Sequence, residues 1–345
     1  MAKRVLRFTE SDSTTRPLSV TTSAPKISIE DFENFAADWL SDCEYRQHSA
    51  KTLDNRRIFL DRVLWFLKHH KCSAVGATEL RQFFTYLTNG HNAPGGRWGS
   101  PRMTRPVRPR TVKDYHGHLR TFFRWLVAEG SIPCSPMEKL AAPVARADQV
   151  QPFTQEQVLA LFQAARGSHH PLRDRAILFF LLDSGVRASE LCSLNIRDVD
   201  LNGRHCTVLG KGNKHRTVYL GRNASRAVKQ YLEKEKRNPD EPLFASERGT
   251  GTGSGLTYNG LRLLIHRLGR AANLQPKRCS PHIFRHTFAV EFLRAGGNVF
   301  TLKELLGHTT LHMTNRYVAL AQADIQNQHR QFSPADHLKK RASRN

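Results

Sequence analysis

Apolar residues recur at helical spacing in four segments near the start of the chain. The first begins at Ser28, and the others run from about 49 to 70, from 78 to 88 and from 111 to 129. Residues three or four positions apart lie on one face of a helix, so each segment predicts an amphipathic α-helix. We therefore predict an all-helical domain of four main helices at residues 27–130. A tail rich in Ser and Thr, expected to be flexible, precedes it at residues 1–26.

A second domain is predicted to begin with a helix start signal. Thr154 and Gln157 form a capping box, and residues 172–183 are nearly all apolar, which predicts a helix buried on all sides. The β-branched runs 206–209 and 216–220 flank a glycine-containing turn and predict a β-hairpin. Helical spacing returns near residues 222–236, 257–272, 283–295, 299–306 and 314–320.

The predicted fold class is mainly α, with an N-terminal four-helix domain and a mixed α/β domain that holds a small antiparallel sheet. The mixed domain is expected at residues 153–320. Several prolines between the two domains predict an extended linker at residues 131–152. The polar C-terminal tail, residues 321–345, is expected to pack on another surface or to be mobile.

Charge points to a polyanionic partner. The chain has 53 Lys and Arg against 30 Asp and Glu, a formal net charge of +23 at pH 7. Such an excess repels itself unless an acidic partner is present, and nucleic acid is the usual one because binding releases counterions. The alternative is a basic protein that is merely soluble.

The basic residues gather in one loop of the N-terminal domain. Residues 89–109 are rich in Gly and Pro and are expected to lack regular structure. The loop and its surroundings supply the predicted DNA-binding residues Arg97, Arg102, Arg105, Arg108, Arg110 and Lys113, with Lys139 and Arg146 in the linker. A run of arginines without acids favours contact with a phosphate backbone, and the alternative is a solvated surface.

Metal, disulfide and membrane chemistry are not indicated. The six cysteines form no C-x-x-C pair and no zinc pattern with histidine, so they read as reduced thiols of a cytoplasmic protein. Asp198 and Asp200 precede a strand and lack histidine partners, which argues against two-metal cleavage. No apolar run reaches membrane length. We therefore expect no metal, no cofactor and no membrane partner.

Six residues, in order, suit metal-free attack on a phosphodiester: Arg187, Lys211, His282, Arg285, His308 and Tyr317. Arginine binds phosphate oxygens with two parallel hydrogen bonds, so Arg187 and Arg285 are candidate phosphate ligands. Tyr317 is the candidate nucleophile, because nearby arginines favour a phenolate and an imidazole can accept its proton. Lys211, in a glycine-flanked turn, could donate a proton to the leaving oxygen.

Each residue also has a purely structural interpretation. Arg187 could form an ion pair with Glu190 three residues on, and His308 could be a polar residue at a helix end. Tyr317 could be a packing residue of an amphipathic helix, and Lys211 could simply belong to a good turn. Only the ordered combination favours chemistry.

The combination resembles a known family. The segments Gly185-Val-Arg-Ala-Ser-Glu-Leu191, Gly210-Lys-Gly-Asn-Lys214, His282-Ile-Phe-Arg-His-Thr-Phe288 and Leu305-Leu-Gly-His308, followed by Tyr317, look like the signature boxes of tyrosine recombinases, the phage integrase family. The resemblance covers residues 154–320, and the helical domain resembles the family's core-binding domain more loosely.

The resemblance implies a site-specific DNA recombinase that needs neither metal nor ATP. Arg187 and Arg285 would bind the scissile phosphate, Lys211 would protonate the 5′-oxygen, and Tyr317 would form a 3′-phosphotyrosyl bond. His282 would take or share the tyrosine proton, and His308 would bind the phosphate.

The resemblance also implies partners and a place of action. A homo-tetramer would recombine two double-stranded DNAs at specific core sites through a Holliday junction, in the cytoplasm on the nucleoid. The C-terminal tail resembles segments that dock on a neighbouring subunit. Two alternatives remain at this point: a strand relaxase like a type IB topoisomerase, and a DNA-binding regulator without catalysis.

Overall fold

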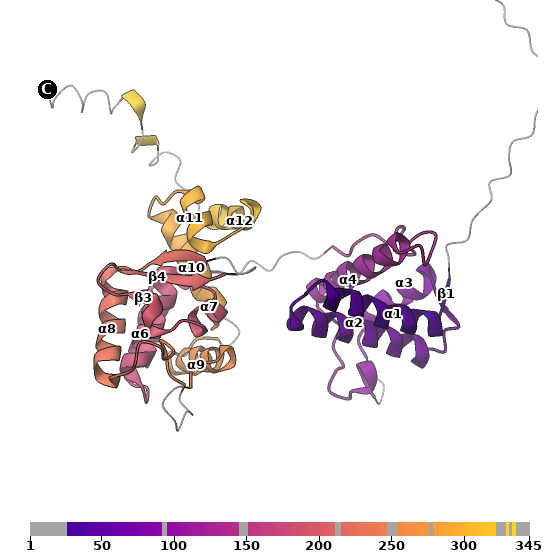
Figure 1. The fold of residues 1–345 in the computed structure, drawn as a ribbon, viewed down its shortest axis with the longest axis horizontal. Helices are drawn as coiled ribbons and strands as arrows, with labels where there is room; N and C mark the ends of the chain where they lie inside the picture. The colour runs from indigo at the N-terminus through magenta and orange to yellow at the C-terminus, as the bar shows by residue number, and fades with distance from the viewer. Residues whose placement is uncertain are drawn as a thin grey trace, which may run out of the picture. The chain divides into compact units, whose positions relative to one another are not determined.

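The computed structural model of the protein describes residues 26–91, 95–144, 151–210, 215–246, 254–275, 279–321, 329–330 and 333–335. The chain divides into two compact units, Met1–Asp148 and Gln149–Asn345, here called the N-terminal and C-terminal units (Figure 1). In these ranges no helix is both long enough and apolar enough to cross a membrane.

Four α-helices build the described part of the N-terminal unit, as the apolar spacing predicts. They are α1 (Ile29–Tyr45), α2 (Ala50–His69), α3 (Ala77–Thr88) and α4 (Pro109–Ala128). Ser28 caps α1, since its hydroxyl accepts a hydrogen bond from the Asp31 backbone N–H at 3.0 Å. Phe32, Phe83 and Phe122 are fully buried between the helices. A short antiparallel pair that the sequence did not predict, β1 (Ile27–Ser28) with β2 (Ala74–Val75), joins the start of α1 to that of α3.

The basic loop between α3 and α4 is more ordered than its composition predicts. It contains a 3₁₀ turn, η1 (Arg97–Gly99), so the expectation of no regular structure is wrong there. The Trp98 ring packs edge-on against Trp65 with 5.5 Å between centroids, and the Trp98 backbone N–H donates to the Tyr86 hydroxyl at 3.2 Å. Aromatic contacts with α2 and α3 therefore dock the loop on the helices.

The segment after α4 is not an extended linker at its start. Ile132 and Met137 are buried in the core of the N-terminal unit, and His116 of α4 forms a 2.8 Å hydrogen bond with the Leu140 carbonyl. Ordering this segment costs chain entropy, and burial of the Ile132 and Met137 side chains offsets that cost. The prediction is therefore wrong for residues 131–140.

The C-terminal unit is built around one buried helix. It begins with α5 (Gln155–Arg166), where the predicted capping box of Thr154 and Gln157 is present. Helix α6 (Pro171–Ser184) follows and packs against α5, α8 (Arg222–Glu235) and α10 (Pro281–Arg294). Its Ile177, Phe180 and Leu181 are fully buried, as the apolar run at residues 176–182 predicts.

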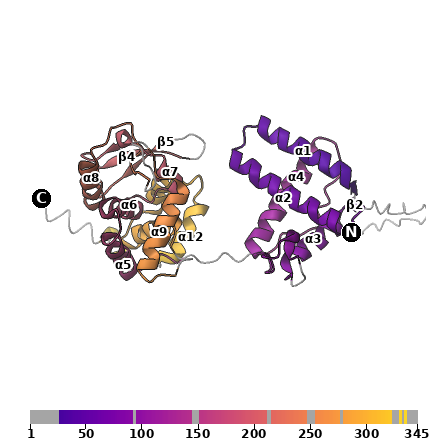
Figure 2. The ribbon, with the colours of Figure 1, turned by 90° about the horizontal axis from the view of Figure 1, so that it is seen from below.

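A three-stranded antiparallel sheet covers part of this core (Figure 2). Its order is β3 (Val199–Asp200), β4 (His205–Leu209) and β5 (His215–Tyr219), with Cys206 opposite Val218. The hairpin was predicted, whereas β3, which follows the 3₁₀ turn η2 (Ile196–Asp198), was not. The residues joining β4 to β5, including Lys211, lie outside the described ranges.

Four further elements position the site residues together with α10: the short helix α7 (Ala188–Cys192), α9 (Tyr258–Ala271), α11 (Val299–Leu306) and α12 (His312–Ala321). The last three helices share a small core of their own, in which Val290, Leu302, Leu306 and Tyr317 are buried. The mainly α fold with a small antiparallel sheet agrees with the predicted fold class.

Candidate active site

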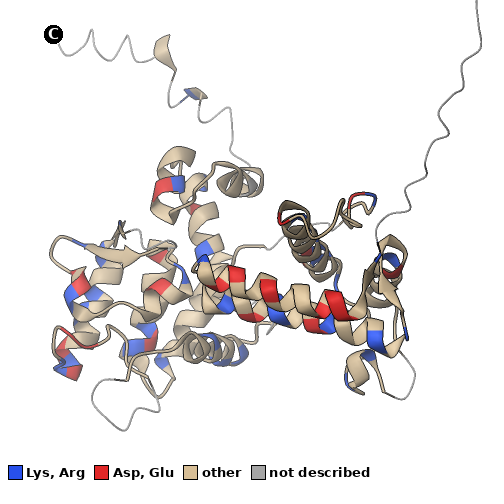
Figure 3. Cartoon of the chain, turned by 45° about the vertical axis from the view of Figure 1, so that its right-hand side comes forward, with Lys and Arg blue, Asp and Glu red and all other residues tan. Residues whose placement is uncertain are grey.

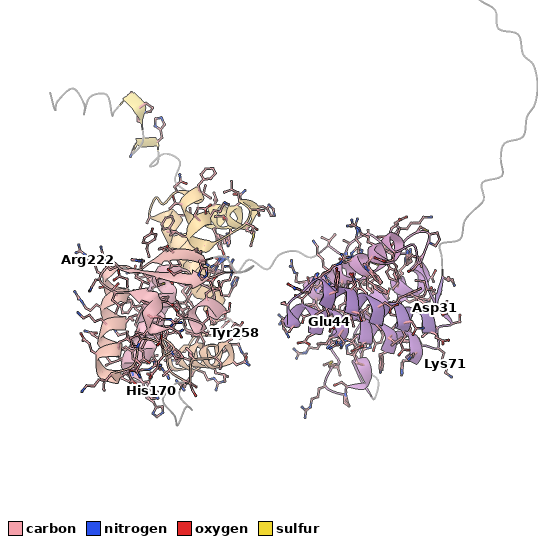
Figure 4. The ribbon with its side chains drawn as sticks, in the orientation of Figure 1. Asp31, Glu44, Lys71, His170, Arg222 and Tyr258 are labelled. Atoms are coloured by element: carbon pink, nitrogen blue, oxygen red, sulfur yellow. The ribbon has the colours of Figure 1, made fainter. Side chains whose placement is uncertain are left out.

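A pocket of about 320 Å³ in the C-terminal unit brings together four of the six predicted residues, Arg187, His282, Arg285 and His308. They come from three places that are distant in the sequence: the turn after α6, the start of α10 and the turn after α11. Tyr258 and Arg262 of α9 also line the pocket, and Tyr258 is labelled in Figure 4.

Arg187 owes its position to a sharp break in the chain. Gly185 adopts a left-handed conformation, and a Cβ there would lie 2.3 Å from the Phe288 ring, so only glycine fits. The break places Arg187 at the N-cap of α7, where it donates to the Glu190 carboxylate at 2.7 Å and to the Gly307 carbonyl at 3.2 Å. The ion pair considered as the alternative is thus present, yet Arg187 also lines the pocket.

Arg285 is fixed in position by hydrogen bonds to two backbone carbonyls. Its guanidinium donates to Gly185 and to Leu306, each at 2.7 Å, and the residue is only 4% exposed. A guanidinium has five N–H donors, so others remain for a phosphate. Burial, together with the nearby Arg187, lowers the pKa of Arg285 to about 10, which leaves it charged near neutral pH.

The two histidines sit differently in the pocket. His282, one turn before Arg285 on α10, is exposed. His308 is buried and follows Gly307, which ends α11 in the left-handed conformation. The Nδ1 atom of His308 lies 2.9 Å from the Thr314 hydroxyl, a contact that fixes the orientation of the ring.

Tyr317 lies next to the pocket but does not line it. Its side chain is fully buried, stacked on His308 and in edge contact with His286, whose ring centroid is 5.0 Å away. The structure therefore places the candidate nucleophile beside His308, a candidate phosphate ligand, without exposing it. Lys211 lies outside the described ranges, so its role stays a prediction.

Sequence reasoning missed the contribution of Arg216. On β5 its guanidinium donates to both oxygens of Glu190, at 2.6 and 2.8 Å. Burial alone would raise the pKa of Glu190, but hydrogen bonds from Arg216 and Arg187 outweigh it and lower that pKa to about 2. The sequence held a signal for this role. In a hairpin Arg216 lies on the same face as the apolar Val208, its cross-strand partner, and an arginine on an apolar face indicates a buried acidic partner.

Most of the predicted DNA-binding residues that the structure describes lie on the surface of the N-terminal unit. Arg102, Arg105, Arg108, Lys113 and Lys139 are exposed. Two others have internal partners, since Arg97 donates to the Arg105 carbonyl at 2.6 Å and Arg110 pairs with Asp114 at 3.4 Å. Arg146 lies outside the described ranges. Elsewhere on the helices basic and acidic residues are interspersed (Figure 3).

The fold and pocket fit an enzyme that binds phosphodiesters, and comparison with known proteins defines the family. Residues 151–324 match the Phage integrase family, and the chain belongs to it. The family predicted from the signature boxes is therefore confirmed.

Individual relatives agree with this assignment. The chain is 37% identical to tyrosine recombinase XerC of Pelobacter propionicus, over 58% of this chain and 65% of that protein. It is 30% identical to XerC of Xanthomonas axonopodis pv. citri, over 80% of this chain and 88% of the relative. Its fold is similar to that of the XerH site-specific recombinase bound to a palindromic difH substrate. The TM-score is 0.63 at 18% identity, over 90% of this chain and 85% of that one.

Proposed function

We propose that this chain, a site-specific DNA recombinase by its family, breaks and rejoins DNA strands through a covalent bond between Tyr317 and a 3′-phosphate. The observation that supports the mechanism most is the pocket that Arg187, His282, Arg285 and His308 share. Two fixed guanidinium groups suit the two non-bridging oxygens of a phosphodiester, because both form charge-assisted hydrogen bonds.

The remaining steps follow from the same groups. Arg187 and Arg285 bind the scissile phosphate and stabilise the charge that develops on it, and His308 donates a further hydrogen bond. His282 accepts the proton of Tyr317 as the phenol attacks. Lys211 protonates the departing 5′-oxygen. The phosphotyrosyl ester retains the energy of the broken bond, so a 5′-hydroxyl from another strand can rejoin without ATP or metal.

The N-terminal unit contributes sequence-independent affinity for duplex DNA. Arg102, Arg105, Arg108, Lys113 and Lys139 are exposed on it, and each would neutralise a phosphate. Together with Arg97, Arg110 and Arg146 they are proposed to follow the DNA backbone. Recombination of two duplexes through a Holliday junction calls for four active sites, so we propose a homo-tetramer acting on DNA at the nucleoid in the cytoplasm.

Covalent trapping tests the mechanism. The wild-type protein first selects its site from a library of random-sequence duplexes, and the enriched sequence is then built into a nicked duplex that prevents rejoining. The wild type should form a protein–DNA adduct that survives denaturation, and the Tyr317→Phe variant should bind the duplex without forming it. An adduct with Tyr317→Phe would overturn the assignment of the nucleophile.

Strand exchange separates the recombinase from the alternatives. Two labelled duplexes carrying the selected site should exchange strands in the presence of the wild type. Relaxation of supercoiled plasmid without any exchange would indicate a topoisomerase instead. DNA binding without an adduct would indicate a regulator.

A further inference from the structure

Three arginines donate hydrogen bonds to three consecutive backbone carbonyls at the end of α11, immediately before His308. Arg216 donates from Nε to Leu305 at 3.1 Å, Arg285 donates to Leu306, and Arg187 donates to Gly307. The last carbonyls of a helix have no partner inside it and concentrate the negative end of its dipole, so cationic donors suit them. The turn that presents His308 is therefore fixed by the guanidinium groups of β5, α10 and the α7 N-cap.

Arg216 also fills the space beneath that turn. Gly307 has a φ of +62°, and a Cβ there would lie 3.1 Å from Cδ of Arg216. The side chain of Arg216 is only 13% exposed. It thus touches the residue directly before His308 while its far end reaches Glu190.

Glu190 joins Arg216 to Arg187. One of its oxygens accepts from Nη1 of both arginines, at 2.6 and 2.7 Å. The other accepts from Nη2 of Arg216 at 2.8 Å and from the Arg187 backbone N–H at 2.7 Å. A single carboxylate with 2% exposure is thus shared between two guanidinium groups.

The charge balance of this group depends on Arg216. With it present, one guanidinium compensates Glu190 and the other, Arg187, keeps its positive field for the pocket. Without it, the buried carboxylate would be compensated by Arg187 alone, because charges in a poorly solvated site must pair. Arg187 would then offer less positive charge to a bound phosphate.

We propose that Arg216 is a positioning residue of the active site: it compensates Glu190 so that the charge of Arg187 is available to the phosphate, and it fixes the turn that presents His308. The proposal rests on the proposed function of the same pocket. It assigns to β5 a task separate from that of Lys211 in the connection between β4 and β5.

Single-turnover cleavage of the nicked duplex carrying the selected sequence tests the proposal. At saturating protein, the adduct should form about 100-fold more slowly with Arg216→Gln than with the wild type, while the Kd for the duplex is unchanged. Arg216→Lys, which keeps the charge but not all three hydrogen bonds, should be intermediate. Arg226→Gln on the exposed face of α8 is the matched control and should cleave at the wild-type rate.

The double variant Arg216→Gln/Glu190→Gln distinguishes charge balance from simple support. Removing the carboxylate as well frees Arg187, so the double variant should cleave faster than Arg216→Gln alone. A purely structural role predicts that the second change slows cleavage further. If Arg216→Gln does not fold at the assay temperature, the comparison of Arg216→Lys with the wild type decides, and equal rates overturn the proposal.

The outcomes separate this proposal from the function on which it rests. A wild type that forms no adduct would refute the proposed mechanism of the enzyme. A wild type that cleaves, with Arg216→Gln equally fast or with the double variant slower than Arg216→Gln, would refute only the role of Arg216.

Discussion

The phenol ring of Tyr317 lies nearly parallel to the imidazole of His308, with 6.2 Å between the ring centroids and 10° between the planes. His308 lines the pocket, whereas Tyr317 is 0% exposed and belongs to the small core of α10, α11 and α12. We therefore expect α12 to shift before Tyr317 attacks a phosphate bound by Arg187 and Arg285, because the buried hydroxyl does not face the pocket.

DNA binding should loosen α12. We expect faster backbone hydrogen–deuterium exchange in residues 312–321 when the Tyr317→Phe variant binds the selected duplex, since leaving the small core exposes that helix. The buried helix α6 serves as the internal control and should not change. Exchange in α12 that stays equally slow, in a protein whose wild type cleaves the same duplex, would contradict a required shift.

Glu190 should make the free energy of unfolding depend on pH in the acidic range. Its pKa of about 2 in the folded protein is below the ordinary 4.5, so its contribution is complete above about pH 4.5 and is lost as pH falls toward 2. That difference corresponds to about 3 kcal/mol of unfolding free energy. Urea unfolding of the wild type and of Glu190→Gln should differ by about this amount near neutral pH and converge in acid. A constant gap across the range would mean that Glu190 acts only through its shape.

The exposed loop arginines should set the salt dependence of DNA binding. Replacing Arg102 and Arg105 by Gln should weaken binding and flatten the plot of log affinity against log salt by about 0.9 for each phosphate that the loop no longer neutralises. Fluorescence anisotropy with the selected duplex measures both. Arg46→Gln, which removes an exposed charge paired with Asp42 on α1, should leave the slope unchanged. An unchanged slope in the loop variant would make the loop a solvated surface.

Local patterns were enough to predict much of the architecture. The four N-terminal helices, the buried α6 and the β4–β5 hairpin follow from apolar spacing and β-branched runs, and the Thr154 cap follows from two residues three apart. These features depend on neighbours within one turn or one hairpin. The order of the signature boxes was likewise enough to predict the family.

What the sequence did not reveal depends on contacts between distant residues. Arg216 reaches Glu190 from 26 residues away, and the carbonyl of Leu305 receives the Arg216 donor from 89 residues away. The basic loop is likewise ordered by the contact of Trp98 with Trp65, and its Gly and Pro content does not predict that contact. The sequence did not decide whether Tyr317 is buried, because tyrosine serves both as a packing residue and as a nucleophile.

Arg285 should tolerate no other cation. Its planar guanidinium satisfies the carbonyls of Gly185 and Leu306 at the same time, and a lysine ammonium at that position could reach only one of them. Arg285→Lys should therefore lose about 1–3 kcal/mol of unfolding free energy for the carbonyl left unpaired, in addition to cleavage activity. The matched change Arg294→Lys, at the exposed end of the same helix beside Glu291, should cost less than about 1 kcal/mol. Urea unfolding compares the two, and equal losses would show that the two carbonyl bonds do not distinguish Arg285 from a surface arginine.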